Sequence, residues 1–310
     1  MHGDSKPSSA ADDAASDAGE VEASVGGATL SLRAMSELLA VPAAILQSWD
    51  KANAILAAGS ATRGPRRYTV SDVAALRRLT DERGGGPEEA GTAADAATPA
   101  PLTLCLQLLS ATDTLDDRQI GATLDRGLHA FGLARTLDEV LLPSMREIGT
   151  RWSAGQCTAD EEHLASGAVL SWLRRRADEA PPPRHERPVV LTCGPLDQHT
   201  IALDAFEVLL RYDRFDCRNL GAQTPVASLR AAVDDCSAQA VILVAHLASN
   251  RAAATAALRA VDQRGVAVFY AGAAFRTQAT RRALPGFYLR ANLGQAAAVV
   301  RARLRPSSPL

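Results

Sequence analysis

Five short strand-like runs that alternate with helical patterns constrain this chain more than any other feature. They lie in its C-terminal part, at Val189–Cys193, Phe215–Leu220, Ala240–Val244, Val266–Tyr270 and Phe287–Leu289. Apolar strands joined by helices are typical of a parallel sheet that is covered on both faces. We therefore predict a doubly wound, Rossmann-like domain over residues 187–304, with a ligand site at the carboxyl ends of its strands.

Helical patterns dominate the preceding region. A first helix is predicted from Leu102 to Ala111, and three later segments have the form of a capping box, in which a capping side chain precedes an amide or acidic residue by three positions. These segments are Asp116 with Gln119, Thr136 with Glu139, and Thr158 with Glu161. Helices joined by such short loops predict a four-helix bundle over residues 102–180.

The N-terminal region divides by composition. Residues 1–27 have almost no large apolar side chains and are predicted to be a disordered tail, and residues 84–101 form a second low-complexity run that is predicted to be a flexible linker. Between them, residues 28–83 predict a small helical domain with a basic loop at 59–67. Because the net charge of the chain is only −2, any contact with DNA must come from such a local basic patch.

Several protein classes are disfavoured by what the sequence lacks. Its five cysteines are dispersed, without zinc-binding spacing, and no run of about 18 apolar residues suggests a membrane span. No secretory leader is visible, so the chain is predicted to be cytoplasmic. Neither a phosphate-binding glycine loop after the first strand nor a nucleophile–base pair is apparent, so we do not expect an enzyme.

A DNA-binding motif is suggested by three stretches within residues 28–83. They are Leu46-Gln47-Ser48-Trp49-Asp50, Thr62-Arg63-Gly64-Pro65-Arg66-Arg67-Tyr68 and Ser71-Asp72-Val73. Together they resemble the winged helix-turn-helix of the MerR family, which implies binding to double-stranded DNA. The resemblance assigns DNA contacts to Gln47, Arg63, Arg66, Arg67 and Tyr68, although the Tyr68 ring is expected to pack rather than to read a base. The alternative is a small interaction domain whose arginines form a solvated loop.

A second motif lies at the end of the helical region, where Trp152 precedes Glu162-His163 by nine intervening residues. This arrangement resembles the helical cap of the CarH/LitR-type cobalamin photoreceptor regulators. The resemblance implies that Trp152 covers an adenosyl group, with Glu162 and His163 facing the upper side of the macrocycle. Taken alone, His163 would be read as an ordinary surface histidine.

A third motif follows the first strand, where Asp197-Gln198-His199 resembles the DxHxxG signature of corrinoid-binding modules. The resemblance makes His199 the lower ligand of cobalt and Asp197 the carboxylate that orients it. It also places a loop containing Thr224 in the site. The other positions that it assigns to the cofactor are Ala202, Ala245, Leu247 and Gly272.

Some of these positions depart from the family pattern. Ala202 replaces the glycine of DxHxxG, Ala245 replaces the serine of a Ser-x-Leu motif, and Ala273 replaces the second residue of a Gly-Gly pair. Each added methyl group is expected to narrow the channel for the nucleotide tail of the cofactor. In addition, Ser153 stands where light-sensing relatives carry a histidine.

These observations lead to one main hypothesis and two alternatives. The main hypothesis is a homo-oligomeric transcriptional regulator in which adenosylcobalamin, held between bundle and sheet, controls assembly and DNA affinity, with light as the natural switch. The first alternative keeps the fold but takes another effector, such as another tetrapyrrole or a protein partner. The second is a corrinoid carrier for a methyltransferase, which the N-terminal DNA-binding motif disfavours.

Overall fold

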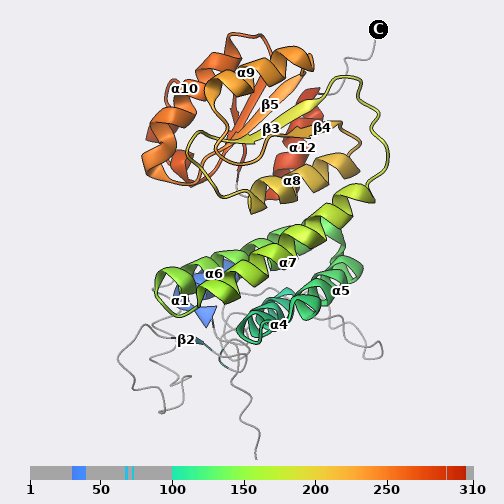
Figure 1. The fold of residues 1–310 in the computed structure, drawn as a ribbon, viewed down its shortest axis with the longest axis vertical. Coiled ribbons are helices and arrows are strands. Elements are labelled where there is room, and N and C mark those ends of the chain that lie inside the picture. Colours follow the sequence, from blue (N-terminus) through green and yellow to red (C-terminus); the bar gives the residue numbers. More distant parts are fainter. Residues whose placement is uncertain (1–29, 40–66, 69–71, 73–99, 291, 305–310) are drawn as a thin grey trace, which may run out of the picture.

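The computed structural model describes residues 30–39, 67–68, 72, 100–290 and 292–304. Most of these residues belong to two stacked parts (Figure 1). The helical unit spans Pro101–Asp178 and the sheet unit spans residues 187–304. None of the described helices combines the length and apolar character needed to cross a membrane.

The sheet unit contains the parallel sheet that the sequence predicted. Its strands are β3 (Val189–Cys193), β4 (Cys217–Asn219), β5 (Ala240–Val244), β6 (Ala267–Ala271) and β7 (Phe287–Tyr288). They pair in parallel in the order β4-β3-β5-β6-β7. The order reverses between β3 and β5, and this switch point is where doubly wound folds bind ligands.

Helices cover both faces of the sheet (Figure 1). One face carries α9 (Val226–Asp235) and α10 (Arg251–Asp262), and the face toward the helical unit carries α8 (Ile201–Tyr212) and α12 (Leu293–Leu304). The connections after β5 and β6 include the short helices η2 (Ala248–Asn250), η3 (Ala273–Phe275) and α11 (Gln278–Arg281). Because both faces are covered, every residue of β3 and β5 is buried, which explains their uninterrupted apolar sequences.

The helical unit consists of α4 (Pro101–Asp113), α5 (Asp117–Thr136), the π-helix η1 (Leu137–Leu141), α6 (Leu142–Ser153) and α7 (Ala159–Asp178). Two of the predicted caps are confirmed. The Asp116 carboxylate accepts a hydrogen bond from the Gln119 amide at 2.9 Å, and Thr158 with Glu161 forms a reciprocal capping box. Helix α7 packs on α8 and so joins the helical unit to the sheet unit.

The predicted cap at Thr136 is wrong. The chain is helical through this residue, and the break occurs four residues earlier at Gly132, whose φ is +77°. Only glycine adopts such a φ without strain. The Thr136 hydroxyl is buried and donates a hydrogen bond to the Gly132 carbonyl at 2.8 Å, so it is not available to cap a helix.

The described N-terminal elements pack on the helical unit. Strand β1 (Leu30–Ser31) pairs antiparallel with β2 (Arg67–Tyr68), and α1 (Leu32–Leu39) follows β1 and contacts α6. Met35 and Tyr68 are completely buried in the same core as the helical unit. The Tyr68 ring therefore packs inside the protein, whereas Gln47, Arg63 and Arg66 lie outside the described residues.

A buried polar network fixes β1 to α6. The backbone amide and hydroxyl of Ser31 both donate to the Glu147 carboxylate, at 3.1 and 2.8 Å. Glu147 also pairs with Arg151, which binds Asp113 of α4 at 3.0 Å. Glu147 and Arg151 are almost completely buried, so their charges are shielded from water, whereas the Asp113 side chain is 44% exposed.

Candidate functional site

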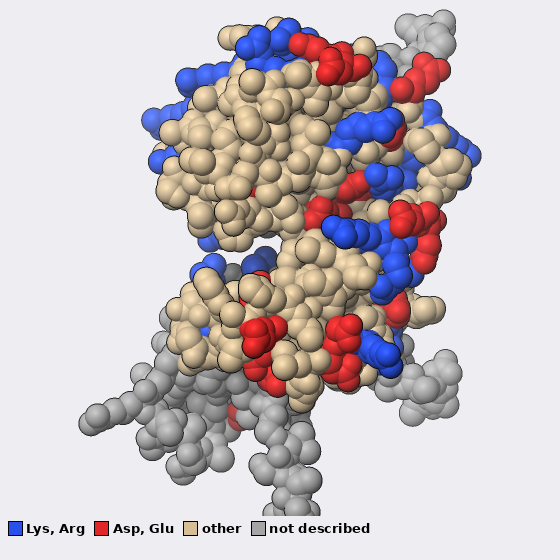
Figure 2. Space-filling model, viewed as in Figure 1, with Lys and Arg blue, Asp and Glu red and all other residues tan. Residues whose placement is uncertain are grey.

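The candidate site lies where the carboxyl ends of β3, β5 and β6 face the helical unit. Figure 2 shows a gap between the two units on this side of the molecule, with basic side chains on both of its edges. The gap is closed on the other side, where α7 packs on α8. A planar ligand held in the gap would therefore meet strand-end loops on one side and helices on the other.

Asp197 organises the loop after β3. Its side chain is completely buried, and one carboxylate oxygen accepts hydrogen bonds from the amide and from Nδ1 of His199, at 3.1 and 2.9 Å. The second oxygen accepts a hydrogen bond from the backbone amide of His246, in the loop after β5. The Asp197 carbonyl accepts a further bond from the Gln223 amide, at 2.8 Å, in the loop after β4. Asp197 thus ties three strand-end loops together.

The electrostatics of Asp197 favour the carboxylate form. Burial raises its pKa, but the nearby His246 ring and the hydrogen bonds from the His246 amide and from His199 outweigh this effect and hold the pKa well below its usual value. An ionised carboxylate on Nδ1 fixes the orientation of the His199 ring and leaves Nε2 as the nitrogen available to an external ligand. The His199 side chain is 59% exposed, so that nitrogen is accessible. The predicted pairing of Asp197 with His199 is present.

His246 is a site residue that sequence reasoning missed, because it stands at the middle position of the Ser-x-Leu motif, where the motif specifies no residue. Its ring centroid lies 5.5 Å from that of His199. Its Nδ1 atom is buried, lies 3.6 Å from the second oxygen of Asp197 and has no hydrogen-bond partner. The available signal was a second histidine at the end of the strand next to β3.

An interface cavity of about 330 Å³ lies beside His246. Its walls are largely apolar and come from the sheet, α8, α12 and α6, with arginines from both units. The lining includes Ala202, Phe206 and Gly272 of the sheet unit, together with Arg33 of α1 and Arg146 of α6. The cavity is present despite the alanine at position 202, so the expected narrowing does not close it.

The two positions that correspond to the family's Gly-Gly pair, Gly272 and Ala273, differ in how much space they leave for a side chain. Gly272 has a φ of +106°, and a Cβ atom there would lie 2.0 Å from the Ala245 carbonyl oxygen, so no other residue fits. By contrast, the neighbouring Ala273 is accommodated at the start of η3. Ala245 does not line the interface cavity, because it is completely buried in the core on the other face of the sheet. Leu247 is about half exposed, and Thr224 is almost buried in the loop after β4.

The remaining predicted residues belong to the helical unit. Trp152, at the end of α6, is 56% exposed, which is unusual for a tryptophan. Glu162 and His163 lie near the start of α7, with a Glu162 oxygen 3.7 Å from His163 Nε2. The end of α6 and the start of α7 lie on the side where the gap opens (Figures 1 and 2).

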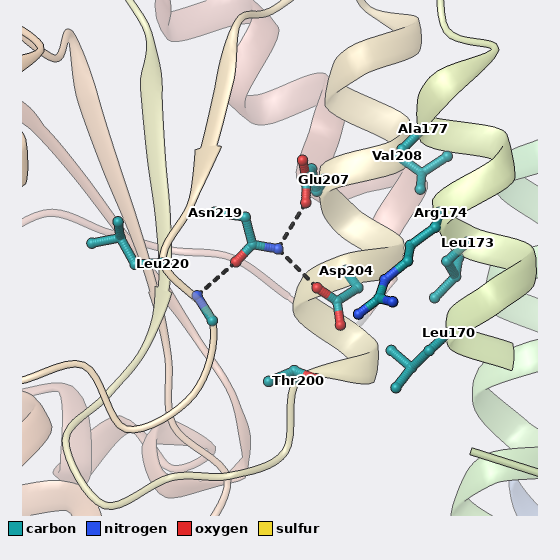
Figure 3. Close-up of a pocket in the computed structure, with 11 residues that line it drawn as sticks. Leu170, Leu173, Arg174, Ala177, Thr200, Asp204, Glu207, Val208, Asn219 and Leu220 are labelled. Atoms are coloured by element: carbon teal, nitrogen blue, oxygen red, sulfur yellow. Dashed lines mark hydrogen bonds between the residues drawn. The ribbon is translucent and has the colours of Figure 1, made fainter. Parts of the chain in front are cut away.

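A second cavity, of about 380 Å³, lies between α7 and α8 (Figure 3) and was not anticipated from the sequence. The Asn219 amide donates to Asp204 at 2.8 Å and to Glu207 at 2.7 Å, while its oxygen accepts from the Gly221 amide. Arg174 of α7 extends toward Asp204. Burial is the main reason that the pKa of Asp204 is raised, and the nearby Glu207 raises it further. The polar groups are satisfied mutually, which is typical of an interdomain contact.

Comparison with known proteins supports the resemblance to cobalamin-binding transcriptional regulators. Residues 104–176 match a family described as a B12 binding domain. The chain is 31% identical over 224 residues to the HTH-type transcriptional repressor CarH of Myxococcus xanthus, covering 66% of this chain and 75% of CarH. It is 26% identical over 212 residues to the repressor CarA of the same organism, covering 66% of this chain and 72% of CarA.

The fold also has a solved counterpart. The monomethylamine corrinoid protein of Methanosarcina barkeri superimposes with a TM-score of 0.55 at 14% identity, over 66% of this chain and the whole of that protein. At this identity the likeness concerns the fold alone. The identity to CarH, by contrast, extends over three quarters of that repressor. The chain therefore belongs to the CarH family of B12-binding transcriptional regulators.

Proposed function

We propose that this chain is a DNA-binding transcriptional regulator whose assembly and DNA affinity are controlled by cobalamin, bound between the helical unit and the sheet unit. The observation that carries the proposal is the exposed His199 ring, oriented by the buried Asp197 carboxylate at the carboxyl end of β3. Family membership supports the regulatory role.

The residues around His199 fit a corrinoid. An imidazole that is held through Nδ1 can present Nε2 to cobalt, and a neutral imidazole is a common ligand of transition metals. Beside it, the interface cavity offers apolar walls of a size suited to an aromatic base, and arginines that could pair with a phosphodiester. When bound, adenosylcobalamin supplies a cobalt–carbon bond that light can cleave.

Each residue of the proposed site then has a defined role. His199 would hold cobalt through Nε2, and Asp197 would fix the tautomer and the orientation of its ring. Trp152 would shield the bound cofactor from water, with Glu162 and His163 beside it. Ala202 and Gly272 line the cavity for the nucleotide tail, while Thr224, Ala245 and Leu247 shape the surrounding strand-end loops. Ser153 would offer the cofactor no imidazole at the position where light-sensing relatives carry a histidine.

The DNA-binding role is assigned to residues 28–83, joined to the helical unit by the linker at 84–101. Three basic residues, Arg63, Arg66 and Arg67, are proposed to contact phosphate and are called the wing arginines below. Gln47 would lie on the recognition element. The Ser31–Glu147 contacts and the presence of Arg33 in the interface cavity support a connection between this region and the cofactor site.

The direct test is a cofactor titration of the full chain in the dark, compared with His199→Ala and with the control His129→Ala. His129 is an exposed residue of α5 that lies outside the proposed site. His199→Ala should shift the visible spectrum of the bound corrinoid and weaken its retention, and the control should match the wild type. If the spectrum and affinity of His199→Ala are unchanged, His199 is not the lower ligand.

A second measurement tests regulation. Sizing and binding to operator DNA should both change when the wild-type protein is loaded in the dark and again when it is illuminated. A protein that binds no cobalamin under any condition would instead support the alternative of a different effector. The apolar interface cavity, which is compatible with other ligands, is the observation that favours this alternative.

A further inference from the structure

We propose that Asp197, His199 and His246 form a second metal site, which binds a zinc-class divalent ion when no corrinoid occupies His199. This inference does not depend on the proposed function, because it concerns the protein without a corrinoid. It starts from the cluster itself, since one potential ligand atom from each residue lies within 4.8 Å of the other two.

The geometry requires only small movements. In a tetrahedral zinc site the metal–ligand distances of about 2.0–2.2 Å place ligand atoms about 3.4 Å apart. The Asp197 carboxylate oxygens already lie 2.9 Å from His199 Nδ1 and 3.6 Å from His246 Nδ1. His199 is the most exposed of the three side chains, so its ring is the one that can rotate to close the site.

The chemistry of the donors selects the class of ion. Two imidazoles with one carboxylate are a ligand set typical of zinc sites that keep a fourth position open to water. Imidazole nitrogen favours zinc, nickel, copper or cobalt over magnesium and calcium, which prefer oxygen ligands.

A second observation supports a ligand at this place. The Nδ1 atom of His246 is buried and has no hydrogen-bond partner, although its nearest acidic neighbour is an Asp197 oxygen 3.6 Å away. Buried polar atoms are normally satisfied, and exceptions suggest an ion or a water. An ion placed between Asp197 and the two rings would satisfy this nitrogen and neutralise the buried carboxylate.

Sharing of His199 has a functional consequence. The His199 ring must rotate to close the zinc site, and this rotation turns Nε2 away from the orientation in which the Asp197 hydrogen bond holds it for cobalt. Zinc should therefore compete with corrinoid for the protein. Competition would make cofactor loading depend on the supply of divalent metal.

The experiment uses the full chain without an affinity tag and Co²⁺ as a spectroscopic probe for the zinc-class ion. The wild type should bind one equivalent with visible d–d bands, and Zn²⁺ should displace it. His246→Gln and His199→Gln should each weaken binding about tenfold or more, since glutamine keeps the approximate size without the ligating nitrogen. His129→Gln, which changes an exposed histidine of α5, should bind like the wild type. Circular dichroism establishes that every variant is folded.

The outcomes separate this proposal from the proposed function. Loss of the d–d bands in both site variants but not in the control supports the metal site. Absence of saturable Co²⁺ binding to the wild type, or equal binding by both site variants, overturns it. Hydroxocobalamin is then added to the Co²⁺-loaded protein, and expulsion of Co²⁺ supports competition at His199. A protein that binds Co²⁺ but no corrinoid would refute the proposed cofactor and leave the metal site intact.

Discussion

Replacing Asp197 by asparagine should destabilise the protein even in the absence of any ligand. Both carboxylate oxygens act only as acceptors, one for the amide and ring of His199 and the other for the His246 amide. An asparagine side chain offers one acceptor and one donor group, so in either orientation a donor faces a donor. The substitution preserves the shape of the side chain but removes its negative charge and this hydrogen-bond complementarity.

The magnitude follows from the bonds that are lost. Leaving a buried donor without an acceptor costs about 1–3 kcal/mol, and a hydrogen bond to a charged group contributes about 1.5–3 kcal/mol. Because the exposed His199 ring can regain bonds with water, we expect the free energy of unfolding to fall by about 2–4 kcal/mol rather than by the full sum. Urea denaturation of the full chain measures this change.

Asp213→Asn is the matched control, because Asp213 pairs with Arg301 at the surface of the same unit. Removal of such a pair should cost about 1 kcal/mol or less. The reasoning is refuted if Asp197→Asn destabilises the protein no more than the control does.

The effect of Asp197 should also depend on pH. Its pKa is lower in the folded protein than in the unfolded chain, so its contribution to stability is complete above the unfolded value of about 3.9. That contribution is lost as the pH falls toward the lowered pKa of the folded state. The difference in stability between wild type and Asp197→Asn should therefore be constant near neutral pH and shrink below about pH 4.

Three further predictions concern other parts of the chain. Neutralising the wing arginines together should weaken DNA binding across sequences and flatten its salt dependence, and an unchanged salt slope in a binding assay would argue against the wing assignment. Gly272→Ala should destabilise by about 4 kcal/mol or more, because its Cβ would meet the Ala245 carbonyl, whereas Gly265→Ala, at a positive φ in open space, should cost about 1–2 kcal/mol in the same denaturation assay. With Ser153 in place of a histidine, illumination of the adenosylcobalamin complex should give a photoproduct that keeps His199 below cobalt; a stable bis-histidine spectrum would contradict this.

Much of the sheet unit could be predicted from the sequence, because burial on both faces leaves a direct signature. β3 and β5 coincide with the predicted apolar runs. The pairing of Asp197 with His199 was also predictable, because the two residues are local neighbours on one loop. Local signals were misleading at Thr136, where the sequence has the capping form but the helix is broken by Gly132 instead.

Other parts of the site depend on contacts between distant segments. The position of His246 beside His199 follows from the parallel pairing of β3 with β5, which no short motif records. Likewise, Ala245 was expected at the tail channel, but the alternation of side chains along a strand buries it on the opposite face. The cavity between α7 and α8 exists only once the two units are packed together.

Helix α6 is shared by two regions of the protein. Near its middle, Glu147 holds the backbone and hydroxyl of Ser31, and its C-terminal end, which carries Trp152, lies on the side where the gap opens. If a ligand in the gap displaces this helix, the free energy of that displacement contributes both to cofactor binding and to operator binding, because thermodynamic linkage is reciprocal. The factor by which cofactor changes operator affinity must then equal the factor by which operator changes cofactor affinity. Measuring cofactor binding with and without operator DNA would thus give the coupling energy of the regulator without any measurement of transcription.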